Sequence, residues 1–162
     1  MAGGSTLDEA VKDAQEKGYA EADPKADLAG HDVRLKVVIL ANELLGARLS
    51  PADVSCVGIE GLTPQILAQA DADGKCWKLI GEASRDENGI VVATVAPKVL
   101  QRSDPLAAVA GATNAITFET KMLGPVSVIG AGAGRIETAY ALLSDIVAIH
   151  RANRPVALEV AA

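Results

Sequence analysis

The chain has 162 residues, of which 49% are apolar and 22% charged, while aromatic residues make up only 2%. These values are typical of one globular domain with a core of aliphatic side chains. A formal charge of −6 with scattered Lys and Arg argues against nucleic acid or an anionic membrane as partner. Because no apolar run reaches membrane-spanning length and no signal-peptide pattern opens the chain, we expect a cytoplasmic protein.

The N-terminal segment reads MAGGS, and we expect residues 1–5 to be a cloning remnant or disordered, with one domain over residues 6–162. A helix is predicted over about residues 6–17, since hydroxyl and acidic side chains follow one another at the spacing of a capping box. Gly18 then provides the usual stop.

An acidic stretch over residues 18–36 reads GYAEADPKADLAGHDVRLK. We predict a loop up to Gly30 and a helix from residue 31 to about residue 45, ended by Gly46. This helix is expected to be mostly buried, because apolar residues fill one stripe, namely Val33, Val37, Leu40, Ala41 and Leu44.

The rest of the chain alternates short β-rich and helical patterns. Asn88-Gly89 between two strand-like runs predicts a β-hairpin. The other predicted elements are a strand over 55–61, a helix over 63–74, strands over 114–120 and 125–130, and an amphipathic helix over 135–153. This order predicts an α+β fold with a mixed, largely antiparallel sheet packed against helices.

The two cysteines, Cys56 and Cys76, stand far apart without a CxxC pattern or paired histidines. Small core or surface thiols are the simplest interpretation. We therefore predict neither a disulfide nor a zinc site, and no other metal site.

A glycine cluster near the C-terminus reads VSVIGAGAGRIETA, with a strand before it and a helix start after it. Gly130 and Gly132 open a GxGxxG frame, but Arg135 takes the place of the third glycine, so an independent dinucleotide fold fits poorly. Spacing alone leaves two interpretations. The segment is a tight strand-to-helix turn, or the helix N-terminus approaches an anionic or cofactor group.

Calcium binding is one hypothesis for the acidic stretch, because Glu21, Asp23, Asp27 and Asp32 are closely spaced. Lys25 would occupy a ligand position of a calcium loop, and the required turn glycine is absent. The stretch therefore fails the test for a calcium loop.

Two interpretations of the acidic stretch remain. Asp32 and Lys36 are spaced i,i+4, so they form an ordinary ion pair at the start of a solvated helix. Alternatively, the apolar run after Lys36 partly desolvates it, and the pair transfers protons, with the upstream carboxylates suited to a substrate ammonium group.

The same stretch resembles the substrate-binding segment of homoserine dehydrogenases, which carries a GYxExDPxxDxxGxDxxxK pattern. Two further segments, SDPLAAVAGATNAITFET and GAGAGRIETAYALLSDIV, are similar to later family motifs and follow in the same order. The resemblance runs from about residue 6 to residue 152. It implies interconversion of L-aspartate 4-semialdehyde and L-homoserine with NAD or NADP, a step of threonine and methionine biosynthesis.

The resemblance also implies roles for single residues. Lys36 would exchange a proton with the substrate oxygen, and Asp32 would hold the substrate hydroxyl and orient that lysine. Glu21 would receive the α-ammonium group, with Asp27 as a neighbouring substrate contact. Three glycines would lie close to the cofactor, namely Gly130, Gly132 and Gly134.

The chain departs from the family pattern at Ala131 and Glu137, where proline is common. Family members resemble a Rossmann domain followed by this kind of region, so we expect a catalytic and dimerisation region that lacks its cofactor domain. Alone, such a region should be an inactive homodimer that binds no cofactor tightly, unless a Rossmann domain is supplied in trans. The alternative is a non-catalytic amino-acid-binding or regulatory module derived from the family.

Overall fold

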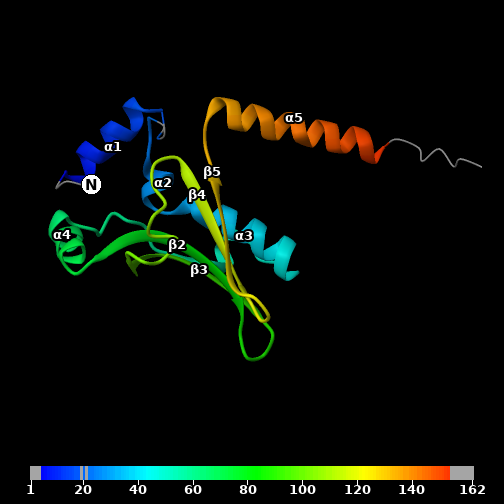
Figure 1. Ribbon diagram of the computed structural model, residues 1–162, viewed down its shortest axis with the longest axis horizontal. Coiled ribbons are helices and arrows are strands. Elements are labelled where there is room, and N and C mark those ends of the chain that lie inside the picture. Colours follow the sequence, from blue (N-terminus) through cyan, green and yellow to red (C-terminus); the bar gives the residue numbers. More distant parts are fainter. Residues whose placement is uncertain (1–4, 19, 21, 154–162) are drawn as a thin grey trace, which may run out of the picture. The chain divides into compact units, whose positions relative to one another are not determined.

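The computed structural model describes residues 5–18, 20 and 22–153 (Figure 1). Most of the expected cloning remnant, residues 1–4, therefore lies outside the described residues. The chain divides into two compact units, Met1–Ala108 and Val109–Ala162. In chain order the elements are α1 (Leu7–Glu16), α2 (Lys25–Leu28), α3 (His31–Leu45), the 3-10 turn η1 (Pro51–Asp53), β1 (Ser55–Cys56), α4 (Pro64–Ala72), β2 (Lys75–Arg85), β3 (Val91–Gln101), β4 (Thr113–Thr120), β5 (Gly124–Ala131) and α5 (Arg135–Ala152).

The strands form one sheet in each unit. In the first unit the strand order is β1-β3-β2, with β2 antiparallel and β1 parallel to β3. In the second unit β4 and β5 form an antiparallel pair. The predicted α+β class with a mixed, largely antiparallel arrangement is confirmed, but the strands belong to two sheets because each unit contributes its own.

Local signals placed the starts of α1 and α4 and the hairpin correctly. Thr6 and Glu9 form the capping box at the start of α1, and Thr63 caps α4 by accepting from Ile66 N–H. Between β2 and β3, Gly89 adopts a positive φ of 79°, and Asp86 Oδ1 accepts the backbone N–H of Ile90 at 2.8 Å. The predicted hairpin at Asn88-Gly89 is confirmed.

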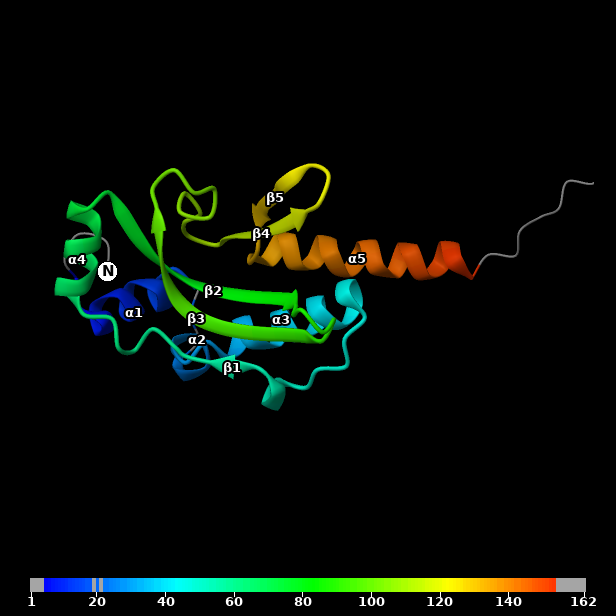
Figure 2. The same cartoon turned by 90° about the horizontal axis from the view of Figure 1, so that it is seen from below.

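Helix α3 packs along β2 and β3 and supplies much of the core of the first unit (Figure 2). The buried cluster consists of Val37, Val38, Val54, Ala93 and Val95. The expectation of a mostly buried helix was wrong, because Ile39 and Leu44 expose 61% and 56% of their surface. A single sheet face buries only one side of a helix, so the remaining apolar side chains of α3 stay accessible.

The predicted strand over residues 55–61 was too long. Only Ser55 and Cys56 pair with β3, and Val57 N–H adds one further bond to Val95 O at 2.8 Å. Ile59 N–H instead donates to Leu28 O at 2.8 Å, so this part of the chain pairs with α2. A tertiary contact, invisible to local periodicity, therefore ends the strand.

The acidic stretch contains a short helix, α2, where the sequence predicted only a loop. The Asp23 carboxylate accepts the backbone N–H of Lys25 at 3.3 Å. Pro24, between these two residues, restricts the backbone φ angle at the start of the helix. Gly30 then takes a positive φ of 78° and separates α2 from α3. The two helices thus meet at one left-handed glycine.

Asp53 closes the turn η1, which precedes the buried Val54. Its carboxylate accepts Ser50 Oγ–H at 2.6 Å and Ser50 N–H at 2.8 Å, and these two bonds hold the pKa of Asp53 below its usual value. A carboxyl with a lowered folded-state pKa stabilises the fold above its unfolded pKa and loses that effect as the pH falls through the folded pKa.

We expect Ser50→Ala to raise the pKa of Asp53 toward its ordinary value, measured by carboxyl NMR titration. The pKa of Glu9, which hydrogen bonds to Thr6 keep low, serves as the internal reference and should not change. The stability difference between Ser50→Ala and the parent chain should narrow as the pH falls through the folded pKa of Asp53. An unchanged Asp53 titration would contradict this account.

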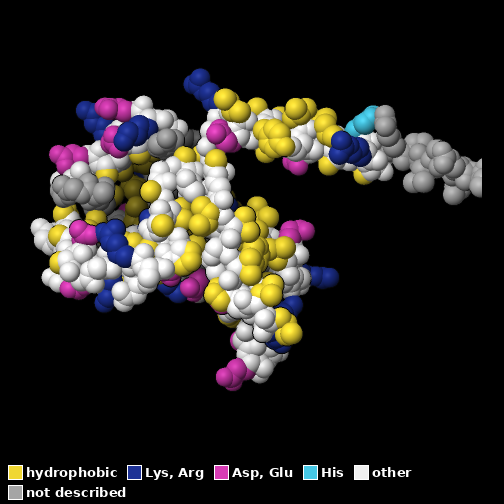
Figure 3. Space-filling model, in the orientation of Figure 1, with side chains coloured by type: hydrophobic (Ala, Val, Ile, Leu, Met, Phe, Trp, Pro, Cys, Tyr) yellow, Lys and Arg dark blue, Asp and Glu magenta, His cyan; other side chains and the backbone are white. Residues whose placement is uncertain are grey.

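The long helix α5 confirms the helix predicted over residues 135–153. Apolar side chains are exposed along this helix (Figure 3). In the described part of the chain, Ile136 exposes 81% and Tyr140 72% of its surface. Among the described residues, no helix combines the length and apolarity that crossing a membrane would require.

Candidate functional site

The candidate site begins with the ion pair of Asp32 and Lys36 in the first turns of α3. Asp32 Oδ2 and Lys36 Nζ lie 2.8 Å apart, as the i,i+4 spacing predicts. Asp32 also lies in the first turn, where the positive end of the helix dipole favours a carboxylate. The carboxylate thereby holds one ammonium group at a defined place on the helix.

The two side chains of this pair are half exposed, at 50% for Asp32 and 51% for Lys36. The expected desolvation of Lys36 is therefore limited within the described residues, although its neighbours Val37 and Val38 are buried. An accessible ammonium beside a carboxylate can hydrogen bond to a small polar molecule and exchange a proton with it.

Asp27 lies on α2, shortly before this pair. Its side chain is exposed, and its carbonyl oxygen accepts Gly30 N–H at 3.1 Å. Arg34 N–H continues this chain of bonds by donating to Gly30 O at 2.9 Å. The α2 and α3 backbones are therefore coupled through Gly30, which relates the position of Asp27 to that of Asp32.

The acidic stretch contains two other carboxylates, Glu21 and Asp23, and the structure describes only Asp23. Glu21 lies outside the described residues, and its role stays a prediction. Asp23 bonds locally to Lys25, with 3.7 Å between its Oδ2 and the lysine Nζ. Asp23 thus shapes the start of α2. Across the described part of the chain, no cluster of three or more His, Cys, Asp or Glu side chains could hold a metal ion.

The three candidate cofactor glycines belong to the second unit, and two of them have structural reasons within it. A Cβ on Gly132 would clash with the side chain of Asn114, and Gly134 has a φ of 143° that disfavours other residues. A Cβ on Gly134 would also clash with the carboxylate of Glu137. The interpretation as a tight strand-to-helix turn therefore accounts for both positions.

Gly130 fits a cofactor-facing role better than the other two glycines. It lies in β5 opposite Asn114, and a Cβ placed on it would meet no heavy atom within 4 Å. The backbone at Gly130 is therefore open to a flat group, whereas Asn114 and Glu137 occupy the space beside Gly132 and Gly134. Contacts within the second unit therefore explain two of the three glycines, and the role of Gly130 near a cofactor stays a prediction.

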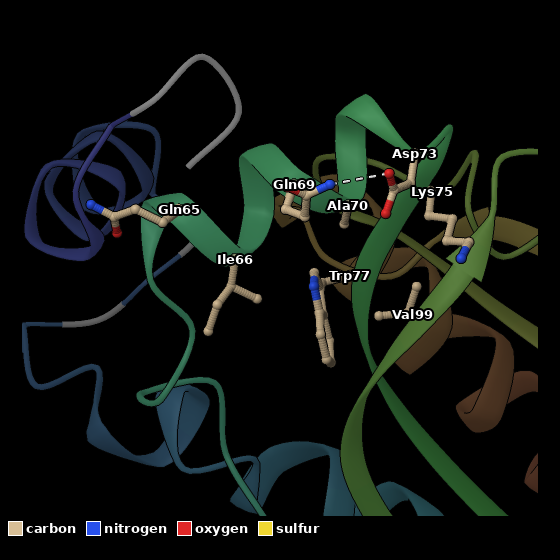
Figure 4. A pocket seen from close by; sticks show the side chains of 8 residues that line it. All are labelled: Gln65, Ile66, Gln69, Ala70, Asp73, Lys75, Trp77 and Val99. Atoms are coloured by element: carbon tan, nitrogen blue, oxygen red, sulfur yellow. Dashed lines mark hydrogen bonds between the residues drawn. The ribbon is translucent and has the colours of Figure 1, made fainter.

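A shallow groove of about 440 Å³ lies between α4 and strands β2 and β3, apart from the Asp32–Lys36 pair (Figure 4). Trp77, Ile66 and Val99 provide apolar surface, and the Asp73 carboxylate accepts Gln69 Nε2–H at 3.1 Å. The sequence analysis did not find this groove, because its residues meet only when α4 folds onto the strands. The remaining lining residues are Gln65, Ala70 and Lys75.

The chain thus combines an α+β fold with an accessible carboxylate–lysine pair in the first turns of α3. The family model of homoserine dehydrogenase matches residues 1–147. The chain therefore belongs to the homoserine dehydrogenase family, as the three ordered motifs predicted.

Curated relatives are similar over nearly the whole chain. The NAD(+)-dependent homoserine dehydrogenase of Pseudomonas canavaninivorans is 56% identical over 151 residues, which are 93% of this chain and 43% of that protein. The homoserine dehydrogenase of Methanocaldococcus jannaschii is 39% identical over 151 residues, again 93% of this chain and 43% of the relative. The chain thus spans less than half the length of these curated relatives.

A solved structure agrees with the fold. The crystal structure of a homoserine dehydrogenase from Thiobacillus denitrificans matches with a TM-score of 0.84 and 36% identity. This match covers 93% of the chain described here and 36% of the solved chain.

Proposed function

We propose that this chain is the substrate-binding and dimerisation region of a homoserine dehydrogenase. The complete protein would interconvert L-homoserine and L-aspartate 4-semialdehyde with a nicotinamide cofactor. The observation that carries the proposal is the 2.8 Å pair of Asp32 and Lys36, two residues for which the resemblance to the family motif implies an acid/base role.

In the proposed oxidation, Lys36 Nζ, in its neutral form, accepts the proton of the substrate hydroxyl as the carbonyl forms. In the reverse direction the ammonium returns that proton to the carbonyl oxygen. Asp32 keeps the lysine in place across the 2.8 Å contact, so that Nζ faces the substrate hydroxyl. A nicotinamide cofactor, when bound, would supply or take up the hydride.

Substrate selection would depend on the carboxylates upstream of this pair. Glu21 would accept hydrogen bonds from the substrate α-ammonium group, and Asp27 would lie beside it as a second contact. Asp27 suits this role because its side chain is exposed and the Gly30 turn couples α2 to α3. A charged ammonium–carboxylate contact is stronger than a neutral hydrogen bond, so it can select an amino acid over a simple alcohol.

The cofactor we propose is NAD, because the Pseudomonas canavaninivorans relative is named as NAD(+)-dependent. Gly130 is the position best suited to lie near it, since a Cβ placed there would point into open space. We expect the isolated chain to bind NAD or NADP weakly and to show no turnover, because most cofactor contacts would come from a Rossmann domain.

A chimera tests the proposed activity directly. The chain would replace the matching 151-residue region of the Pseudomonas canavaninivorans relative, with which it is 56% identical. We expect NAD reduction on addition of L-homoserine, and none with the unmodified chain alone. A folded chimera that binds NAD but does not oxidise homoserine would sink the proposal, whereas robust turnover by the chain alone would contradict the expected need for a second domain.

Calorimetric titration with L-homoserine tests the substrate contacts on the chain itself. We expect binding that Glu21→Ala weakens at least about tenfold, since a charge-assisted hydrogen bond contributes roughly 1.5–3 kcal/mol. The control is Asp23→Asn, which should leave the affinity for L-homoserine unchanged, because Asp23 pairs locally with Lys25. Homoserine binding without activity in the chimera would favour the alternative, a non-catalytic amino-acid-binding or regulatory module.

We also propose that the chain forms a homodimer. Apolar side chains remain exposed on two helices, Ile39 and Leu44 of α3 and Tyr140 and Leu143 of α5, and such surface is typical of interfaces. Light scattering at micromolar concentration should give twice the 16.6 kDa chain mass. A monomeric mass at that concentration would rule out a stable dimer.

A further inference from the structure

The segment that leaves β1 contacts the connection between α2 and α3. Residues 56–59, here called the positioning segment, cross directly against the turn between α2 and α3. That turn connects Asp27 with Asp32 and Lys36. Three contacts from consecutive parts of the segment reach it.

The first contact is a backbone hydrogen bond. Ile59 N–H donates to Leu28 O at 2.8 Å, and Leu28 is the last residue of α2. This bond fixes the residue that directly follows Asp27. Since Leu28 is half-buried, the bond is partly shielded from water and less easily replaced by it.

The second contact is a close approach of backbones at Gly58. A Cβ placed on Gly58 would clash with the carbonyl oxygen of Leu28 and lie 2.6 Å from the Cα of Ala29. Backbone atoms cannot move aside as the end of a flexible side chain can. Glycine is therefore required at this position for α2 to lie where it does.

The third contact comes from Cys56. Its thiol donates to Ala29 O at 3.2 Å, and its Sγ would lie 3.2 Å from a Cβ placed on Gly30. Gly30 is buried, and Val95 and Leu79 of the sheet would also lie within 4 Å of that Cβ. The thiol thus supports the left-handed turn from which α3 begins.

We propose that the positioning segment sets the position of Asp27 relative to the Asp32–Lys36 pair, with Gly58 as its main positioning residue. This inference rests on the proposed function, which supplies the roles of the three polar side chains. The one polar side chain of residues 56–59 is the Cys56 thiol, which bonds to the turn itself at Ala29 O, so the segment would act only through the α2–α3 turn. Substrate affinity should therefore depend on Gly58 through Asp27.

The experiment adds one methyl group at two glycines of the same loop in the 162-residue chain. Gly58→Ala should displace α2 and weaken L-homoserine binding at least about tenfold in calorimetric titration. Gly61→Ala is the matched control, because a Cβ at position 61 meets nothing within 4 Å. The affinity of this variant for L-homoserine should equal that of the parent chain. Equal affinities of Gly58→Ala and Gly61→Ala would overturn the inference.

A double-mutant cycle separates positioning from general destabilisation. If Gly58 acts through Asp27, the two losses of affinity should not add. The double variant Gly58→Ala/Asp27→Asn should then bind L-homoserine no more weakly than whichever single variant binds it less tightly. Fully additive losses would contradict the inference. Should Gly58→Ala fail to fold, Cys56→Ala enters the same cycle, with a smaller loss expected and the same criterion of non-additivity.

A readout without substrate keeps this inference distinct from the proposed function. The carboxyl carbon resonances of Asp27 and Asp32 should shift in Gly58→Ala but not in Gly61→Ala. If the parent chain does not bind homoserine, the proposed function fails while these resonances still test the positioning. Unchanged resonances in a folded Gly58→Ala variant would overturn the inference, whatever the chain binds.

Discussion

Lys36→Met in the active chimera should lower kcat for homoserine oxidation by about 10²–10⁴-fold, the usual contribution of a general acid or base. Methionine has a similar length but cannot accept or return a proton. The KM for homoserine should change little, because Glu21 and Asp27 would recognise the ammonium group. Initial rates of NADH formation across homoserine concentrations separate the two parameters.

Two matched variants test whether the loss of kcat comes from the missing proton transfer of Lys36. Lys25→Met removes an exposed lysine of α2 that pairs only locally with Asp23, and it should retain full kcat. Lys36→Arg keeps the positive charge near Asp32 but scarcely exchanges protons at neutral pH, so it should also lose activity. If Lys36→Arg kept the parent kcat, Lys36 would provide charge alone, and the proton-transfer role would be wrong.

Gly81→Ala should destabilise the first unit by about 1–3 kcal/mol, the usual effect of overpacking a well-filled contact. Gly81 lies in β2 directly beneath α3, where a Cβ would clash with Val37 and come within 2.9 Å of Val33 Cγ1. Urea unfolding followed by the fluorescence of Trp77 measures the change, since that residue lies on the same strand.

Gly61→Ala is again the control, because it adds the same methyl group where nothing lies within 4 Å. Its unfolding midpoint should stay close to that of the parent. A Gly81→Ala variant as stable as this control would show that α3 can move away from β2 without cost. The close packing of that helix on the sheet would then not limit stability.

Local patterns predicted the parts of the fold that depend on neighbouring residues. The capping box of Thr6 and Glu9, the glycine that ends α3 and the hairpin turn at Gly89 all follow from backbone preferences within a few residues. The strand over residues 55–61 failed, because Ile59 bonds to Leu28 rather than to β3. No periodicity in a single segment reports such a partner.

The candidate site shows the same division. The i,i+4 spacing was enough to predict the pair of Asp32 and Lys36, because helix geometry alone brings such residues together. It could not predict that the pair remains half exposed, since burial depends on what packs around α3. The role of each residue in turnover stays a prediction until the variants are measured.

By itself, the sequence determined the α+β class, the family and the carboxylate–lysine pair, because ordered motifs and helical spacing are properties of the chain order. Only the tertiary structure decided how the α2–α3 turn is supported. Any residue larger than glycine at position 58 would clash with the backbone of Leu28 and Ala29, although about thirty positions of sequence separate Gly58 from these two residues. That contact exists because β1 pairs beside β3 and brings its exit against the turn, so packing rather than local preference determines where Asp27 lies.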